Sequence, residues 1–159
     1  MPYAKPSSDP RSLSFRIRSA AEKDFPVIME MIKELAVFEK APDQVRNTVE
    51  QMQREKDYFK ALVAEKSDGE IIGMAVFFFA YYTWVGKSLY LDDLYVKEKY
   101  RGQGVGKALL EKVLEFARQN RCKRVRWQVL EWNTPAIEFY KKMGVRLDDE
   151  WINCDVEYP

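Results

Sequence analysis

Hydrophobic and polar residues alternate in some stretches of the chain and recur with a helical period in others. Phe15 and Ile17, for example, alternate with Arg16 and Arg18, which is typical of a strand with one buried face. Alternating stretches and short apolar runs together predict strands over residues 14–19, 58–65, 71–82, 87–96, 124–130 and 151–157. Apolar residues three and four apart predict helices over residues 24–38, 48–56, 104–120 and 133–143.

Capping and turn residues mark the ends of these elements. Asp24 and Asn133 are placed as N-caps, and each is followed by a proline in the first helical turn. Residues 67–70, Ser-Asp-Gly-Glu, are typical of a hairpin turn. The resulting order, β-α-α-β-β-β-α-β-α-β, has no repeat and no linker, which predicts a mixed α/β fold. We expect one domain over residues 14–159, preceded by a flexible tail over residues 1–13.

The composition is that of a globular protein without a strong charge preference. Of 159 residues, 47% are hydrophobic, and 26 basic and 25 acidic residues leave a net charge of +1, which selects no partner. The longest apolar run, residues 74–82, is too short to span a membrane, and residues 1–13 lack the apolar core of a signal peptide. Cys122 and Cys154 are interpreted as reduced thiols, so we expect a cytoplasmic protein without a membrane partner.

The chain contains no histidine. Its absence removes histidine-based catalytic triads, histidine general bases and every zinc site that uses imidazole. Two cysteines without a histidine partner also make a nucleophilic thiol a poor candidate. Acid–base chemistry then falls to Asp, Glu, Tyr, Lys or water, and we expect no metal cofactor.

A glycine-rich segment, Arg-Gly-Gln-Gly-Val-Gly-Lys at residues 101–107, lies between a predicted strand and a predicted helix. In that position, bare backbone N–H groups at the helix start suit a phosphate. A Walker A loop is excluded, because Arg101 and Ala108 stand where it needs Gly and Ser or Thr. A dinucleotide fingerprint is excluded, because Lys107 and Leu109 stand where it needs glycine. Both a phosphate loop and a tight turn that merely needs glycine stay open on these grounds.

This segment resembles the pyrophosphate-binding motif of the GCN5-related N-acetyltransferases (GNAT), which bind acetyl-coenzyme A. Three further segments resemble the spermidine/spermine N1-acetyltransferase family: residues 34–39 (ELAVFE), 90–96 (YLDDLYV) and 131–140 (EWNTPAIEFY). Residues 38–40 (FEK) and 83–86 (TWVG) look closer to its thialysine N-epsilon-acetyltransferase branch. The resemblance covers residues 14–157 and implies the GNAT acetyltransferase fold, whose mixed central sheet splays open beside the cofactor.

The resemblance also implies which residues bind acetyl-CoA, the acyl donor. Backbone groups of Leu94, Tyr95 and Val96 pair with the pantetheine arm, which uses an exposed strand edge. A second cofactor contact falls on Asn133 and Ala136, at the start of the next helix. The pyrophosphate is held by the glycine-rich motif, which comprises Arg101, Gly102, Gln103, Gly104, Val105, Gly106 and Lys107.

Acetylation of an amine needs a neutral amine and an acid for the leaving thiolate. By resemblance Tyr140 is that acid, although its helical spacing alone would favour a core aromatic. An amine with a pKa near that of lysine, about 10.4, is mostly charged at pH 7, so carboxylates are needed to attract it and accept its proton. Asp92 and Asp93 are the candidates, and strand alternation places them on opposite faces. The family usually has Glu-Asp here, so the shorter Asp92 favours a water relay over direct contact.

Several other positions match residues near the family's substrate pocket, and one departs from them. The matching residues are Phe38, Glu39, Trp84, Asp93, Gln128 and Glu150. A solvated surface stays open for the acids, and packing for Trp84. The polyamine branch carries an acid where this chain has Tyr82, which favours a smaller amine with one distal charge. We predict acetyl transfer from acetyl-CoA to a small primary amine, thialysine-like, lysine-like, or a diamine or polyamine, by direct attack in a ternary complex.

Two alternative functions and one assembly complete the expectations. Basic residues gather over residues 118–126 beside Trp127, which suggests a nucleic-acid module or a contact with the 3′-phosphate of CoA. No RNA-binding signature accompanies them, so a solvated helix end is preferred and no nucleic-acid partner is expected. The other alternative is a CoA-binding sensor without turnover. The family builds its acceptor pocket between two subunits, which implies a homodimer, and the alternating end segment, residues 151–158, would need a partner edge.

Overall fold

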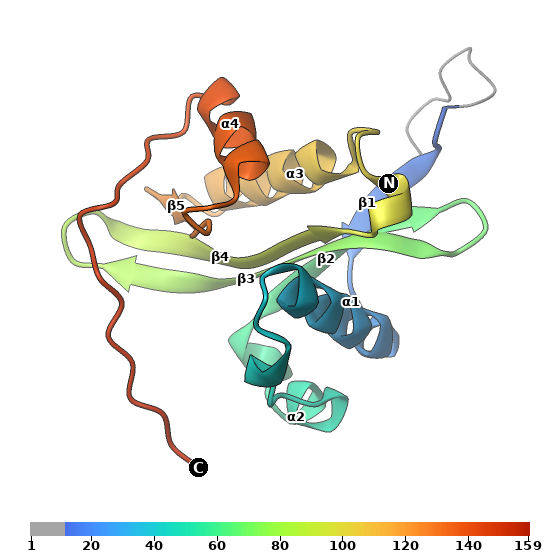
Figure 1. Ribbon diagram of the computed structural model, residues 1–159, viewed down its shortest axis with the longest axis horizontal. Coiled ribbons are helices and arrows are strands. Elements are labelled where there is room, and N and C mark those ends of the chain that lie inside the picture. The colour runs from blue at the N-terminus through green and yellow to red at the C-terminus, as the bar shows by residue number, and fades with distance from the viewer. Residues whose placement is uncertain (1–11) are drawn as a thin grey trace. The chain divides into compact units, whose positions relative to one another are not determined.

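The computed structural model describes residues 12–159, which fall into two compact units. The first unit ends at Trp127, and the second, Gln128–Pro159, is described by itself. Residues 1–11 of the predicted flexible tail lie outside the described residues. The predicted mixed α/β fold is confirmed, because helices flank a five-stranded mixed sheet (Figure 1).

The sheet of the first unit has the strand order β1-β2-β3-β4-β5. Neighbouring strands run antiparallel, except that β5 is parallel to β4. The strands are β1 (Phe15–Ser19), β2 (Lys60–Lys66), β3 (Ile71–Tyr82), β4 (Gly86–Val96) and β5 (Val125–Arg126). β3 and β4 form a long hairpin that extends past α1 and α2 (Figure 1).

Helices cover both faces of this sheet. The first helices, α1 (Phe25–Phe38) and α2 (Val49–Arg54), lie on one face, and α3 (Val105–Gln119) lies on the other (Figure 1). We call these the α1 face and the α3 face. The second unit contains α4 (Thr134–Lys142). None of the helices in the described part of the chain is long and apolar enough to cross a membrane.

Each face of the sheet carries its own apolar core. On the α1 face, Met74 and Val76 of β3 belong to one buried cluster with Ile28 of α1. On the α3 face, Phe77 contacts Phe116 of α3, with ring centroids 5.2 Å apart. Alternate residues of β3 therefore point to opposite cores, as a strand buried on both sides requires.

Gly73 allows α3 to lie close to the sheet. A Cβ at this position would lie 3.0 Å from the carbonyl oxygen of Tyr95 and 3.1 Å from Cδ1 of Leu109. Both distances are shorter than ordinary carbon contacts, so a side chain here would push the helix away from β3 and β4.

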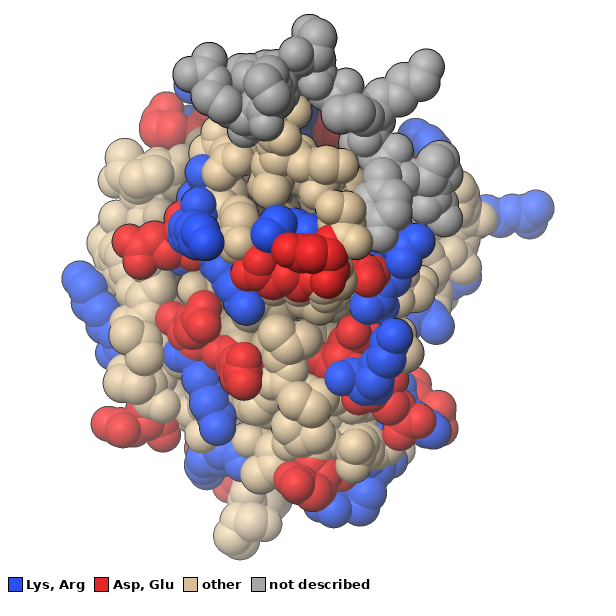
Figure 2. Space-filling view, turned by 90° about the vertical axis from the view of Figure 1, so that its right-hand side faces the viewer, with Lys and Arg blue, Asp and Glu red and all other residues tan. Residues whose placement is uncertain are grey.

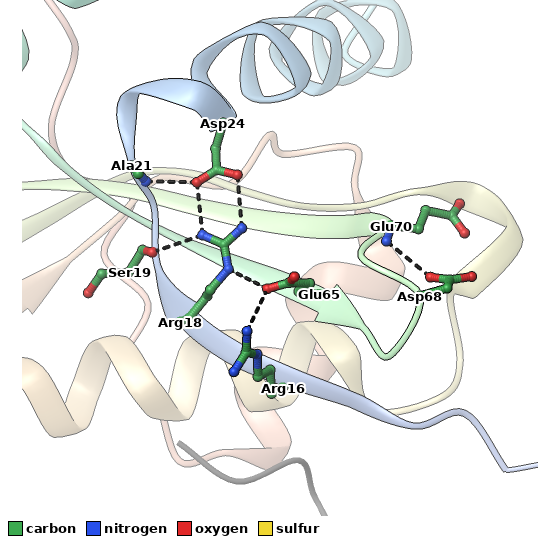
Figure 3. A network of polar contacts seen from close by, with 8 residues as sticks. All are labelled: Arg16, Arg18, Ser19, Ala21, Asp24, Glu65, Asp68 and Glu70. Atoms are coloured by element: carbon green, nitrogen blue, oxygen red, sulfur yellow. Dashed lines mark hydrogen bonds and ion pairs between the residues drawn. The ribbon is translucent and has the colours of Figure 1, made fainter.

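Arg18 of β1 links the sheet to the start of α1 (Figure 3). Its guanidinium donates two hydrogen bonds to Asp24, at 2.8 and 2.9 Å, and another to Glu65 of β2. Asp24 also accepts from the amide of Ala21 at 2.7 Å, so its carboxylate serves this network and does not cap α1 as the sequence predicted. Hydrogen bonds from Arg18 lower the pKa of both Asp24 and Glu65, which keeps these acids ionised at neutral pH.

Charged side chains of both signs are interspersed over the side of the molecule shown in Figure 2, and neither sign dominates it. This side includes the β2–β3 turn at the right of Figure 1, where Lys66 lies 3.2 Å from Asp68 and 2.9 Å from Glu70. The mixture agrees with the net charge of +1.

Two predicted strands differ from the structure. The strand predicted over residues 124–130 is reduced to the two residues of β5. The strand predicted over residues 151–157 is wrong: the segment contains no strand, and its side chains are exposed, Ile152 by 89% and Val156 by 81%. Alternation produces a strand only where the backbone finds a partner, and among the described residues no strand pairs with this segment.

Candidate active site

An irregularity in the pairing of β3 with β4 shapes the middle of the sheet. Val76 pairs with Asp93 and Phe77 pairs with Leu91, so Asp92 has no partner and forms a β-bulge. Val76 lies in the core of the α1 face, and its partner Asp93 therefore points to that face. The carboxylate of Asp93, next to the bulge, therefore lies on the face that α1 covers.

Three carboxylates interact at the bulge: those of Asp92, Asp93 and Glu39, the last at the C-terminal end of α1. Loss of hydration raises the pKa of Asp93 to about 7, and the charges of Asp92 and Glu39 raise it as well. Loss of hydration also raises the pKa of Glu39, with a contribution from Asp92, and the pKa of Asp92 itself. Asp92 and Glu39 are exposed and Asp93 is half-buried, so this acidic cluster can attract a cation from solvent.

The bulge corrects the expectation that Asp92 and Asp93 point to opposite faces. An extra residue in one strand interrupts the alternation of side chains, and Asp92 acts on both Asp93 and Glu39. Both aspartates therefore contribute to one acidic cluster. Among the residues that the structure describes, no group of three or more His, Cys, Asp or Glu side chains is arranged to hold a metal ion.

The outer edge of β4 is paired over only part of its length. β5 pairs with β4 at Leu89 and Tyr90, and no strand in the described part of the chain pairs with this edge beyond them. Leu94–Val96 therefore presents backbone groups along an open edge. The hydroxyl of Tyr95 donates a hydrogen bond to Oε2 of Glu34 at 2.7 Å, which ties this stretch to α1.

The glycine-rich segment forms the turn into α3. Gly102 and Gly104 have φ angles of 73° and 84°, in the left-handed region that favours glycine. A Cβ at either position would meet no atom within 4 Å, so the requirement comes from backbone conformation and not from space. Gly104 is the N-cap of α3 and offers no side chain to the first amides of the helix, at Val105 and Gly106. These amides and the helix dipole suit an anion.

Arg101 joins this turn to the end of α1. Its guanidinium lies over two rings, 5.3 Å from the centroid of Tyr95 and 5.6 Å from that of Phe38. Its Nε donates to the carbonyl of Val96 at 2.9 Å. Arg101, Tyr95 and Phe38 line an open groove of about 890 Å³ together with Glu34. Two predicted cofactor residues, Arg101 and Tyr95, thus share one groove with the predicted substrate residue Phe38.

Other predicted residues lie in the second unit. Asn133 accepts a hydrogen bond from the amide of Ala136 at 3.4 Å, so these two residues meet at the start of α4. Tyr140 lies on the same helix. Gln128 donates a hydrogen bond to Asn153 at 2.8 Å. Glu150 is exposed, and its amide donates to Asp148 at 3.2 Å.

Trp84, a predicted substrate residue of the first unit, lies away from the acidic cluster. It lies in the turn between β3 and β4 and is 84% exposed. From Gly86 to Asp92 the strand rises by about 20 Å, which separates Trp84 from the acids.

One feature of this surface was missed from the sequence. The guanidiniums of Arg124 and Arg126 both lie over the ring of Tyr82, the last residue of β3. The available signal was the spacing of two between the arginines, which places them on one side of a strand. Which strand lies next to them could not be read from that spacing.

Comparison with known proteins shows which family this chain belongs to. Residues 20–145 match the model of the Acetyltransferase (GNAT) family. The chain belongs to the GNAT acetyltransferase family. A thialysine N-epsilon-acetyltransferase of Sus scrofa is 41% identical to this acetyltransferase over 144 residues, which are 84% of this chain and 85% of that protein. A spermidine/spermine N(1)-acetyltransferase-like protein 1 of Homo sapiens is 34% identical over 140 residues, 82% of this chain and 20% of that protein.

These relatives confirm the predicted branch of the family, and they identify the acetyltransferase as an N-acetyltransferase that acts on an amine. Solved structures show the same fold. An aminoglycoside acetyltransferase from an uncultured soil metagenomic sample has a TM-score of 0.74 at 19% identity, covering 91% of this chain and 97% of that one. An acetyltransferase of Trypanosoma brucei has a TM-score of 0.71 at 23% identity, covering 89% and 99%.

We expect the carboxyl group of Asp93 in this acetyltransferase to titrate near pH 7, as the pKa of about 7 requires. Carbon-13 NMR of the side-chain carboxyl carbons measures this directly. Asp92→Asn should lower the pKa of Asp93, because it removes a neighbouring negative charge. Asp68 is the internal control, since its pKa is lowered by the hydrogen bond from the amide of Glu70. A pKa near 4 for Asp93 would contradict the description of the cluster.

The same shift predicts how stability depends on pH. The pKa of Asp93 is higher in the folded protein than the ordinary value of 3.8, so the folded state holds this proton more tightly than the unfolded chain does. Its contribution to stability is therefore lost as pH rises from about 4 to about 7. In Asp93→Asn, the melting temperature should therefore fall less over this pH range than it does in the unchanged protein. Thermal denaturation at a series of pH values measures the difference.

Proposed function

We propose that this N-acetyltransferase transfers the acetyl group of acetyl-CoA to a small primary amine, by direct attack of the amine in a ternary complex. The candidate acceptors are thialysine, lysine-like amines, diamines and polyamines. The proposal rests mainly on the acidic cluster, in which Asp92 and Asp93 of β4 meet Glu39 from the end of α1, and on the open edge of β4 beside it. The acids attract a cationic amine, and the strand edge suits an extended acyl donor.

The residues fit acetyl-CoA, which supplies the activated thioester. Backbone groups of Leu94–Val96 are proposed to pair with the pantetheine arm along the unpaired edge of β4. The amides of residues 102–107 are proposed to hold the pyrophosphate, which the positive φ angles of Gly102 and Gly104 support. The turn from Asn133 to Ala136 is the proposed second contact.

Within the acidic cluster, we propose Asp93 as the residue that accepts the proton of the amine. A proton acceptor works best when its pKa lies near the working pH, and the pKa of Asp93 is about 7. This revises the sequence-based choice of Asp92 acting through water. Asp92, exposed at the bulge, remains suited to attract the ammonium group and to pass a proton through water to its neighbour.

Acetyl transfer then balances with one acid and one base. The neutral amine nitrogen forms a bond to the acetyl carbon, and the carbon–sulfur bond breaks. The ammonium group gives one proton to the acidic cluster before the attack, the nitrogen gives a second as the amide forms, and the cluster passes both to solvent. Tyr140 is proposed to donate its phenolic proton to the departing thiolate, and the proton is later restored from solvent.

We expect release of free CoA thiol when the protein is given acetyl-CoA and an amine. The panel should hold thialysine, lysine, diamines and polyamines, because the acidic cluster recognises a cation and does not by itself distinguish these acceptors. Spectrophotometric detection of the thiol measures turnover. Binding of CoA without thiol release for every amine would instead support a CoA-binding sensor. RNA binding without turnover would support a nucleic-acid module.

Two substitutions should separate chemistry from cofactor binding. Tyr140→Phe removes one hydroxyl, so we expect kcat to fall by roughly 10²–10⁴ with the affinity for CoA nearly unchanged. Gly104→Val places a branched side chain where the pyrophosphate approaches, so we expect CoA binding to be lost in a protein that still folds. Turnover assays and calorimetric titration with CoA measure the two effects.

Gly69→Val is the matched control for Gly104→Val. Gly69 lies in the β2–β3 turn with a φ of 89°, and a Cβ there also meets nothing within 4 Å. Both variants should lose similar stability from backbone strain, about 1–2 kcal/mol. Equal loss of CoA binding in both, or an unchanged kcat in Tyr140→Phe, would contradict these assignments.

We also propose that the acetyltransferase is a homodimer. The support is the family resemblance and the exposed apolar side chains of Trp151, Ile152 and Val156, which lie 71%, 89% and 81% exposed in the single chain. Light scattering at micromolar concentration should give twice the monomer mass of 18.8 kDa. A fully active species with the monomer mass would rule the dimer out.

A further inference from the structure

Two arginines and one tyrosine form a basic cluster on the sheet, away from the glycine-rich turn. The guanidinium carbons of Arg124 and Arg126 lie 5.3 and 5.0 Å from the centroid of the Tyr82 ring. A guanidinium that lies over a ring still has its N–H groups free along its edge, where they can donate two parallel hydrogen bonds. All three side chains are half-buried, so the cluster is both held in place and reachable from solvent.

This cluster lies on the same face of the sheet as the acids. Arg126 pairs with Tyr90 of β4, and Tyr90 pairs with Phe78 of β3, with the two rings 5.3 Å apart. Phe78 and Tyr82 are an even number of residues from Val76, which lies in the core of the α1 face. Paired residues point to one face, so the arginines and the acidic cluster belong to the same surface.

Tyr90 lies between the two charged groups. The pKa of Tyr90 is raised by burial and by the charges of Asp92 and Asp93, and it is lowered by the charge of Arg126. Neither arginine forms a salt bridge with a carboxylate in the described part of the chain, so their positive charge is not neutralised within it. The α1 face thus carries an acidic end at the bulge and a basic end near Tyr82.

We propose that Arg124 and Arg126, held on the ring of Tyr82, bind the carboxylate of the acceptor, so that the acceptor is an amino acid whose side chain ends in a primary amine. This inference rests on the proposed function, because it assumes that the amine binds at the acidic cluster. Arg126 pairs with Tyr90, which is three residues before Asp93 on the neighbouring strand. The rise along β4 and the spacing between strands therefore place the Cα atoms of Asp93 and Arg126 about 11 Å apart. Side chains reaching inward from both suit a molecule whose charges lie about 7 Å apart, as in an extended diamino acid.

The same cluster disfavours acceptors without a carboxylate. A diamine or polyamine would bring a second positive charge to the arginines, which repel it. Tyr82 contributes because it orients the guanidiniums without cancelling their charge. A carboxylate at position 82 would cancel that charge and would itself attract a distal ammonium group.

The test compares acceptors that differ only by the carboxylate. Lysine is paired with cadaverine, and thialysine with bis(2-aminoethyl) sulfide, and kcat/KM is measured for each. Arg126→Gln and Arg124→Gln should each lower kcat/KM for the two amino acids by roughly ten- to a hundredfold, the range for a lost charge-assisted hydrogen bond. The two diamines should change little, or improve.

Three controls accompany these variants. Lys123→Gln removes one positive charge from the neighbouring exposed position and should leave every ratio unchanged. Tyr82→Phe should keep the preference for amino acids, whereas Tyr82→Ala should weaken it, because the ring and not the hydroxyl holds the guanidiniums. The affinity for acetyl-CoA should stay the same in all of them.

Each other outcome overturns the proposal in a different way. An equal loss for amino acids and diamines would show that the arginines do not recognise the carboxylate. A loss of acetyl-CoA affinity that is absent with dephospho-CoA would assign them to the 3′-phosphate of CoA. If no amine is turned over, the proposed function fails, and equilibrium binding of lysine against cadaverine to the same variants still decides the carboxylate subsite.

Discussion

The β-bulge at Asp92 is the constraint on which the rest of the site depends. On one side of it, Asp93 and Tyr95 hold the register that packs β4 against the α1 core, and Tyr95 reaches Glu34 of α1. On the other side, Leu91 and the residues before it pair normally towards the hairpin end. One extra residue therefore lets the strand keep both cores filled while it presents two adjacent acids to one cluster.

The acidic cluster at the bulge destabilises the folded protein, and it also raises the pKa of a carboxylate that can accept a proton. Loss of hydration, and after it the charges of Asp92 and Glu39, raise the pKa of Asp93 to about 7, so the three carboxylates do not all ionise freely. A binding amine relieves the repulsion, so the acids favour a cationic ligand. The packing of Arg18 with Asp24 and Glu65 shows the opposite case, in which a guanidinium lowers the pKa of its partner acids. The protein thus pairs acids with arginine where it needs a fixed structure, and leaves them unpaired where we propose chemistry.

Much of the fold could be predicted from the sequence, because its signals are local. The continuous apolar run from Ile71 to Tyr82 marks β3, and Thr48 and Asn133 mark the starts of two helices. The bulge could not be predicted, because residues on both sides of Asp92 continue a strand pattern and only the pairing with β3 reveals the extra residue. The end segment alternates without forming a strand for the converse reason: its pattern says nothing about whether a partner exists. In the site, the acids and the glycine-rich turn were predicted from residue type together with the family resemblance, whereas the cluster around Tyr82 required knowledge of which strands are neighbours.

The central claim is that the acceptor lies along the α1 face, with its amine at the bulge and its carboxylate at the arginines. NMR titration of isotope-labelled protein with lysine tests it most directly, by following the side-chain carboxyl carbons and the arginine Nε groups. We expect saturable shifts at the carboxyls of Asp92, Asp93 and Glu39 and at Nε of Arg126, all with one dissociation constant. Shifts that leave the carboxyls of Asp92 and Asp93 unmoved while lysine binds elsewhere would contradict it.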